Sequence, residues 1–325
     1  MSKIPWIEKY RPRQIDNIVI DDTIMREIKN IVKNKDIPNM ILTGTPGIGK
    51  TTTLLCLAYE LYGPYVKEAV LELNASDDRG IQSINSSVIN FCNYLLSYKN
   101  EKNCSYAKHK LIIFDEADNM TDKALPIISK LMDTYHETTR FVFTCNVSSK
   151  IIESIQSRCK ILRFARLTTD FVCKKLTDIC IKEEVKYKRD GIEEIAIISN
   201  GDLRSAINLL QLTNDKYNKI NMSSVSKTCD KPSAVLIKNI IVNCINNNLK
   251  DAIISAFNLK QNGFTGVDII YNSFNVLKLH ICNDITEDTK IKVLSVISDY
   301  MFSISKTMDT DVQLSSFLIE LCQIK

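Results

Sequence analysis

The sequence predicts an α/β protein, with a phosphate-binding parallel sheet in the first half of the chain and helical domains after it. Three observations carry this prediction. A glycine-rich motif, GTPGIGKT, spans residues 44–51. An apolar run that ends in Asp-Glu occupies residues 111–116. From about Leu167 onward, short apolar runs of strand length give way to helical patterns.

The motif at 44–51 fits G-x-x-x-x-G-K-[ST], the phosphate-binding loop of nucleotide hydrolases. A predicted strand, 40–42, precedes it, and a helical pattern over 52–61 follows. Lys50 is expected to reach the β- and γ-phosphates, and the Thr51 hydroxyl to hold Mg²⁺. The alternative, a glycine-rich turn before an ordinary helix, is disfavoured by the flanking strand and helix. The predicted nucleotide-binding residues of this loop are Gly44, Thr45, Pro46, Gly47, Ile48, Gly49, Lys50, Thr51 and Thr52.

Composition limits the classes of protein that fit. The chain has 325 residues, enough for two or three domains, and a net charge of +4. That charge is too small to indicate a nucleic-acid binder by itself, so any DNA contact is expected to be local or shared with partners. The 11 cysteines lack C-x-x-C spacing, which argues against a disulfide framework and a zinc ribbon. We expect reduced thiols in a cytosolic or nuclear compartment, with no signal segment and no membrane span.

The elements before residue 111 follow from periodicity and from chain-breaking residues. An arm rich in aromatic, basic and proline residues comes first, and is expected to pack on the first domain, to cover a nucleotide base, or to do both. A polar junction at 74–81 follows the second strand, at the edge where open α/β sheets bind ligands. In order, we expect the arm at 5–12, a helix at 23–33, a strand at 69–73, a helix at 83–96 and a polar surface loop at 99–110.

The run 111–114 has no polar residue, as in the centre of a parallel sheet, and it ends in Asp115 and Glu116. Asp115 is expected to bind Mg²⁺ directly or through water, and Glu116 to orient and deprotonate the attacking water. The alternative is a solvated acidic turn. The phosphate loop upstream strengthens the catalytic interpretation.

Polar residues at later junctions have two interpretations each. A strand at 141–145 ends on Asn146, whose amide can hold the lytic water or can simply favour the turn. Arg158 precedes a further strand at 161–164, and a lone arginine is usually a solvated surface charge. Arg204 lies in the first turn of a predicted helix, where a cation opposes the helix dipole, which suggests placement for a phosphate. The predicted helices after the sheet are 171–183, 192–200 and 203–214.

Taken in order, the motifs resemble those of the small ATPase subunits of the sliding-clamp loader, replication factor C, in the AAA+ superfamily. The resemblance runs over the whole chain and rests on order and spacing rather than on one motif. The motifs are PWIEKYRP, GTPGIGKTT, LELNASDDRGI, LIIFDEAD, TTRF with a downstream Asn, IIESIQSRC and GDLRSAIN.

The resemblance implies a parallel-sheet AAA+ domain at 1–165, a helical lid at 166–231 and a helical collar at 232–325. It implies that Asn146 is the first sensor and that Arg204 is the second, reaching ATP from the lid of its own subunit. Arg158 matches the arginine finger, which acts on ATP held by the neighbouring subunit. The resemblance also places the arm residues Tyr10, Arg11 and Pro12 against adenine, and the residues Arg79, Gly80 and Ile81 against DNA phosphates.

The implied function is an ATPase that uses ATP and Mg²⁺ to open a PCNA-like sliding clamp and place it on primer–template DNA. The implied partners are other clamp-loader subunits in a heteropentameric ring, the clamp and the DNA, with no membrane. The implied location is the nucleus for a cellular protein, or the host cytoplasm or viral factory for a large DNA virus.

In the phosphate loop, Thr45 and Ile48 replace the family's usual Pro and Thr, and three further positions depart from the family pattern. Asn85 and Ser129 stand where basic residues are usual, and Pro126 is awkward in a helix beyond its first turn. Two DNA-facing charges are therefore missing, and we expect weaker DNA binding by this subunit, or a larger share carried by its neighbours.

Three other functions fit parts of the sequence. An RNA helicase is rejected despite the DEAD string, because a second helicase domain is missing and the lid and finger motifs would be unexplained. A protein-remodelling AAA+ enzyme is disfavoured by the arm and by residues 74–81. A scaffold subunit that binds ATP without hydrolysing it stays open, although Lys50, Asp115, Glu116 and Asn146 favour hydrolysis.

Overall fold

A computed structural model describes residues 4–18, 20–74, 81–94, 96, 106–229, 232, 234–278, 286–306 and 311–324. These residues form two compact units, 1–214 and 215–325. The boundary falls within one helix, α10 (Leu203–Tyr217). The division groups the predicted lid helices with the sheet, so the three-domain boundaries at 165 and 231 stay a prediction.

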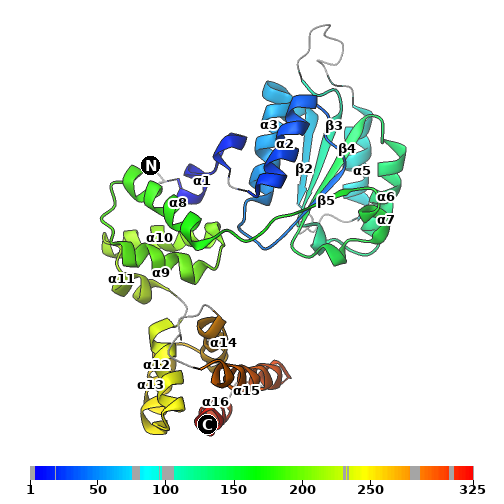
Figure 1. Cartoon of the computed structure of the whole chain (residues 1–325). Helices are drawn as coiled ribbons and strands as arrows, with labels where there is room; N and C mark the ends of the chain where they lie inside the picture. The colour runs from blue at the N-terminus through cyan, green and yellow to red at the C-terminus, as the bar shows by residue number, and fades with distance from the viewer. Residues whose placement is uncertain are drawn as a thin grey trace. The chain divides into compact units, whose positions relative to one another are not determined.

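The first unit contains a parallel sheet whose five described strands lie in the order β2-β3-β4-β1-β5 (Figure 1). Each strand pairs in parallel with its neighbours, so the strand ends that carry polar residues share one edge. All five strands predicted from the apolar runs are confirmed. The strands are β1 (Met40–Thr43), β2 (Val70–Asn74), β3 (Lys110–Asp115), β4 (Thr139–Cys145) and β5 (Lys160–Arg163).

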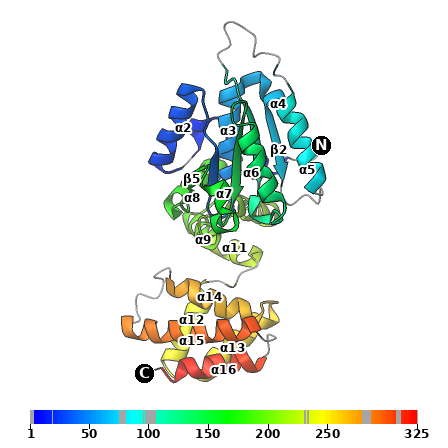
Figure 2. The same ribbon diagram turned by 90° about the vertical axis from the view of Figure 1, so that its right-hand side faces the viewer.

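Helices cover both faces of the sheet (Figures 1 and 2). Successive strand residues point to opposite faces, so each strand contributes to two cores. The helices of the first unit are α1 (Trp6–Lys9), α2 (Asp22–Asn34), α3 (Lys50–Tyr62), α4 (Val66–Ala69), α5 (Ile81–Asn93), α6 (Ala124–Thr134), α7 (Glu153–Gln156), α8 (Thr169–Lys182), α9 (Arg189–Ser199) and most of α10.

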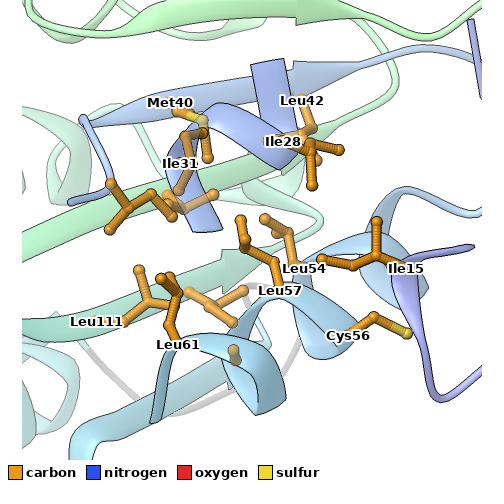
Figure 3. Packing of buried hydrophobic residues seen from close by; sticks show 14 of the residues in the cluster. Ile15, Ile28, Ile31, Met40, Leu42, Leu54, Cys56, Leu57, Leu61 and Leu111 are labelled. Atoms are coloured by element: carbon orange, nitrogen blue, oxygen red, sulfur yellow. The ribbon is translucent and has the colours of Figure 1, made fainter. Parts of the chain in front are cut away.

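One core packs α2 and α3 against the sheet and includes Met40 and Leu42 of β1 (Figure 3). Ile41, between them, belongs to the core on the other face, with residues of α5, α6 and α7. There the rings of Phe114 and Phe143 stack with their centroids 5.2 Å apart. These two cores fix β1 and β3 rigidly, and both strands deliver site residues at their carboxyl ends.

The prediction of a surface loop at 99–110 is wrong for the last residues of that range. Residues 99–105 lie outside the described residues, but Ala107 and His109 are buried, and Lys110 is only 5% exposed and begins β3. The Lys110 Nζ donates to the carbonyl oxygens of Phe91 (2.8 Å) and Cys92 (2.7 Å), in the last turn of α5. A cation there satisfies free carbonyls and complements the helix dipole, which explains why a lysine is buried.

Two expectations for α6 also change. Pro126 is the third residue of the helix, so it lies in the first turn, where no backbone N–H donor is needed. Ser129 is buried, at 7% exposure, whereas Lys130 is exposed. In this packing, position 129 faces the core and not the surface. The side chain of Asn85 lies outside the described residues.

The second unit is helical and has its own core, drawn from all the helices after residue 230. In the described ranges, no helix is both long and apolar enough to span a membrane. The nine cysteines described are free thiols, as predicted for this part of the chain. The helices are the end of α10, α11 (Met222–Thr228), α12 (Ala234–Ile245), α13 (Leu249–Gln261), α14 (Gly266–Lys278), α15 (Glu287–Lys306) and α16 (Asp311–Cys322).

Candidate nucleotide-binding site

The glycine-rich loop connects β1 to α3, as the motif requires. Gly47 and Gly49 have φ angles of +72° and +96°, in the left-handed region that favours glycine. A Cβ on Gly47 would also lie 1.7 Å from the Asp202 Oδ1, so no other residue fits there without movement. Ile48 is 2% exposed and anchors the loop in the core beneath it. The glycines therefore allow the tight path of the loop, and one buried side chain anchors it.

Lys50 is the best-satisfied cation of the site. Its Nζ donates to the carbonyl oxygens of Gly44 (2.6 Å) and Thr45 (2.9 Å) and to the Oδ1 of Asn146 (3.1 Å). Burial lowers the pKa of the Lys50 ammonium, and the charges of Cys145 and Asp115 oppose that shift. The side chain thus lies across the loop, with its ammonium held by the same residues that would surround a phosphate.

A hydroxyl and carboxylate network joins three chain segments beside Lys50. The Thr51 Oγ1 lies 3.1 Å from both carboxylate oxygens of Asp115 and donates to them. The Thr144 hydroxyl also donates to Asp115, and it accepts the backbone N–H of Glu116 at 3.1 Å. Asp115 therefore receives two side-chain hydroxyls, and Thr144 connects it to the next residue, Glu116.

Glu116 has an unusual backbone. Its φ of +53° lies in the left-handed region, which is costly for a residue with a side chain. Its carboxylate is exposed and accepts from the Asn119 amide at 3.3 Å. The strained conformation turns Glu116 away from the line of β3, while its N–H stays bonded to Thr144. Such outliers occur often at functional sites.

The end of β4 supplies the third part of the site. The Asn146 side chain accepts from Lys50, and its backbone N–H donates to the Asp118 Oδ2 at 3.3 Å. The other carboxylate oxygen of Asp118 is buried, with no hydrogen-bond partner among the described residues. A hollow of about 350 Å³ lies beside Asn146 and is also lined by Gly44 and Arg163.

The start of α10 touches the phosphate loop. The Leu203 N–H donates to the Gly47 carbonyl at 3.2 Å. Asp202 caps the helix, since its Oδ1 accepts the Ser205 N–H at 3.0 Å. Arg204, in the first turn, is exposed and has no hydrogen bond or ion pair with any residue that the structure describes. This arrangement brings Arg204 to the same edge as the loop with its guanidinium uncommitted.

The N-terminal arm contacts more than the expected first domain. The Trp6 N–H donates to the Gln211 side chain of α10, and the Tyr10 hydroxyl donates to Glu183, just after α8, at 2.6 Å. Further along, the Pro12 carbonyl accepts from the Cys56 thiol of α3. The arm thus joins the lid helices at one end and the sheet domain at the other. Arg11 pairs only with Glu8, at 3.5 Å, among the described residues.

Arg158, after α7, is not part of this cluster. Its hydrogen bonds within the described chain go to Asp133 and Ser154, and none goes to the phosphate loop. Arg79 and Gly80 lie outside the described residues, and Ile81 is described only as the first backbone position of α5.

Sequence reasoning missed three acidic or hydroxyl residues of the site. Thr144 is the one that joins Asp115 to Glu116, Asp118 holds the backbone of Asn146, and Asp202 fills the space at Gly47. The available signal for Thr144 was a hydroxyl in an otherwise apolar strand. The DEAD string contains Asp118, but only the fold shows which strand it meets.

Models of three families match successive parts of the chain. The family described as ATPase family associated with various cellular activities (AAA) matches residues 40–167. The RCF1/5-like AAA+ ATPase lid domain matches 174–213, and the replication factor C C-terminal domain matches 232–320. The order of the matches follows the order of the predicted domains.

Relatives match over nearly the full length. Replication factor C subunit 4 of Schizosaccharomyces pombe is 39% identical over 321 residues, covering 99% of this chain and 92% of its own. A protein of Acanthamoeba polyphaga mimivirus, named as a replication factor C small subunit, is 37% identical over 320 residues, covering 98% and 97%. The replication factor C small subunit of Methanococcus vannielii is 36% identical over 319 residues, covering 98% of each chain.

Among solved structures, the RuvB Holliday junction branch migration motor of Thermotoga maritima aligns with a TM-score of 0.54 at 17% identity. The alignment covers 72% of this chain and 79% of that one. At that identity the likeness concerns the fold alone. With relatives above 30% identity along almost its whole length, this chain belongs to the replication factor C small-subunit family of AAA+ ATPases.

Proposed function

We propose that this chain binds ATP with Mg²⁺ and hydrolyses it as one subunit of a clamp loader, the complex to which its family belongs. The observation that carries the proposal is the convergence of Lys50, Thr51, Asp115 and Asn146, linked by hydrogen bonds at one edge of the sheet. Those are the groups that phosphoryl transfer needs, and they come from three separate strand ends.

Lys50 binds the β- and γ-phosphates in this proposal. Its ammonium now donates to the carbonyls of Gly44 and Thr45, so ATP exchanges neutral acceptors for charged phosphate oxygens. Thr51 and Asp115 fit Mg²⁺, because they bring a hydroxyl and a carboxylate to within 3.1 Å and because Mg²⁺ prefers oxygen ligands. When bound, the ion neutralises charge on the phosphate oxygens.

Glu116 takes the proton from the attacking water. The left-handed backbone and the bond from its N–H to Thr144 fix the start of its side chain, while the carboxylate itself stays exposed. Asn146, already bonded to Lys50, is placed to touch the γ-phosphate or the water. Transfer needs a base and an oriented water more than covalent chemistry, which suits this set of residues.

Two arginines complete the charge stabilisation. Arg204 acts on ATP of its own subunit, which the contact between Leu203 and Gly47 supports. Arg158 acts in trans on ATP of a neighbouring subunit, which is supported by the lack of any hydrogen bond from it to the phosphate loop within the described chain. An arginine supplied in trans makes hydrolysis depend on assembly.

The partners proposed are the other loader subunits, a PCNA-like clamp and primer–template DNA, with DNA held by backbone contacts rather than by base recognition. Relatives named as replication factor C in eukaryotes and in a mimivirus support a site of DNA replication, the nucleus or a viral factory. Tyr10, Arg11 and Pro12 lie between the lid and α3, and we propose that they contact adenine.

The test is the ATPase rate of this chain alone and with partner subunits from the same source, each with and without primed DNA and clamp. We expect a nearly inactive lone chain and a mixture stimulated by DNA plus clamp. Glu116→Gln should keep ATP bound and stop turnover at this site. A lone chain that hydrolyses ATP well and ignores both would refute the trans assignment. ATP binding without any contribution of this site to turnover would favour the scaffold alternative.

A further inference from the structure

Arg158 is held by an acidic partner on a neighbouring helix. Its Nε and Nη2 donate to the two carboxylate oxygens of Asp133, at 2.7 and 3.1 Å. Its Nη1 donates to the Ser154 carbonyl at 2.7 Å. Asp133 is on α6 and Ser154 on α7, so two separate helices fix the plane of one guanidinium.

These contacts leave a defined pair of donors unused. A guanidinium has five N–H groups: one on Nε and two on each terminal nitrogen. Asp133 and Ser154 take the Nε hydrogen and one hydrogen from each terminal nitrogen. Within the part of the chain that the structure describes, the remaining hydrogens, one on Nη1 and one on Nη2, have no acceptor. Each of these two hydrogens, one on Nη1 and one on Nη2, can donate to a phosphate oxygen.

A contribution to folding does not account for the pair. The side chains of Arg158 and Asp133 are 40% and 58% exposed, and exposed ion pairs add little to stability. Asp133 is also the second-last residue of α6, where the helix dipole disfavours an acid. Its position is therefore unfavourable for the helix itself.

We propose that Asp133 is a positioning residue: it holds Arg158 with these two donors unused, ready for the γ-phosphate of ATP on the neighbouring subunit. This inference rests on the trans role proposed above for Arg158. An unrestrained arginine loses rotamer freedom when it reaches the phosphate, and the pair with Asp133 removes much of that freedom beforehand.

The test uses the complex assembled with partner subunits, primed DNA and clamp. Arg158→Ala first measures the full effect of the arginine on kcat. Asp133→Asn keeps the shape of the side chain but removes one acceptor and the charge. We expect it to lower kcat by about three- to tenfold, with the KM for ATP and complex assembly unchanged. Asp133→Glu, which retains the carboxylate, should recover part of the loss.

Two comparisons separate positioning from general damage. Glu193→Gln is the matched control, because Glu193 accepts from the Arg189 Nε at 2.7 Å on the exposed surface of α9. It should leave kcat unchanged. In the Arg158→Ala background, Asp133→Asn should cause no further fall, since Asp133 acts through the arginine.

The outcomes distinguish the two proposals. If Arg158→Ala leaves kcat unchanged, the trans assignment fails and this inference fails with it. If Arg158→Ala lowers kcat but Asp133→Asn behaves like Glu193→Gln, only the positioning inference is overturned. A rise in kcat with Asp133→Asn would also overturn it, because Asp133 would then be restraining the arginine from the phosphate.

Discussion

Removing the Thr144 hydroxyl tests most directly whether the hydrogen bonds around Asp115 and Glu116 matter for hydrolysis. Thr144 is 1% exposed, donates to Asp115 and accepts the Glu116 N–H at 3.1 Å. Thr144→Val keeps the volume and removes both hydrogen bonds. The bond to the carboxylate is worth ~1.5–3 kcal/mol and the bond from the N–H about 1 kcal/mol. Glu116 keeps a second acceptor, the Asp115 Oδ1 at 3.2 Å, so the first bond is the larger loss.

If the lost hydrogen-bond energy normally holds Asp115 and Glu116 in place in the transition state, kcat should fall by about tenfold or more. A loss of 1.4 kcal/mol corresponds to roughly a factor of ten. The assay is single-turnover ATP hydrolysis by the assembled complex, beside thermal unfolding of the chain, where a decrease in Tm of about 5 °C is expected. Thr213→Val is the control, because Thr213 is fully buried and its hydroxyl donates to the Leu209 carbonyl at 2.7 Å, on α10.

Thr213→Val loses one neutral hydrogen bond, so it should lower Tm by less than Thr144→Val and leave hydrolysis unchanged. The reasoning would be refuted if Thr144→Val hydrolysed ATP within about twofold of wild type while its Tm fell by the expected amount. The hydroxyl would then serve only the fold, and Asp115 and Glu116 would be held by other contacts.

Three further predictions concern stability and DNA. The pKa of His109 is lowered to about 4, chiefly by burial and then by Arg140, so the folded state binds fewer protons than the unfolded state. The free energy of unfolding should therefore fall by up to about 3 kcal/mol as the pH drops from 6.5 to 4. In urea titrations, His109→Gln should make the free energy of unfolding less dependent on pH over this range. Glu194 is 7% exposed, its Oε1 has no hydrogen-bond partner among the described residues, and burial raises its pKa. Because a buried carboxylate without a partner destabilises the fold, Glu194→Leu should raise Tm at neutral pH. An unchanged or lower Tm would contradict this. If basic contacts are fewer than in relatives, the salt dependence of DNA binding by the assembled complex should be shallower than theirs, and an equal slope measured by titration would count against it.

The sequence by itself determined the elements that depend on local chemistry. Glycines at 44, 47 and 49, a lysine and a threonine specify a phosphate loop, because each residue type is needed for a turn or a ligand at a fixed offset. Apolar runs located all five strands, and the helical pattern at 203–214 located α10. The observed ends of several helices and strands differ by a few residues from the predicted ends, because capping contacts decide where an element ends.

The tertiary structure decided which of these residues meet. Asp115, Thr144 and Asn146 reach Lys50 and Thr51 only because β3 and β4 lie beside β1 in the sheet. Strand order follows from the packing of helices on both faces of the sheet. This packing involves residues far apart in the chain, so no short stretch of the sequence shows the strand order. For the same reason the burial of Lys110 and the pairing of Asp133 with Arg158 could not be predicted: a polar side chain looks solvated until the fold supplies its partner.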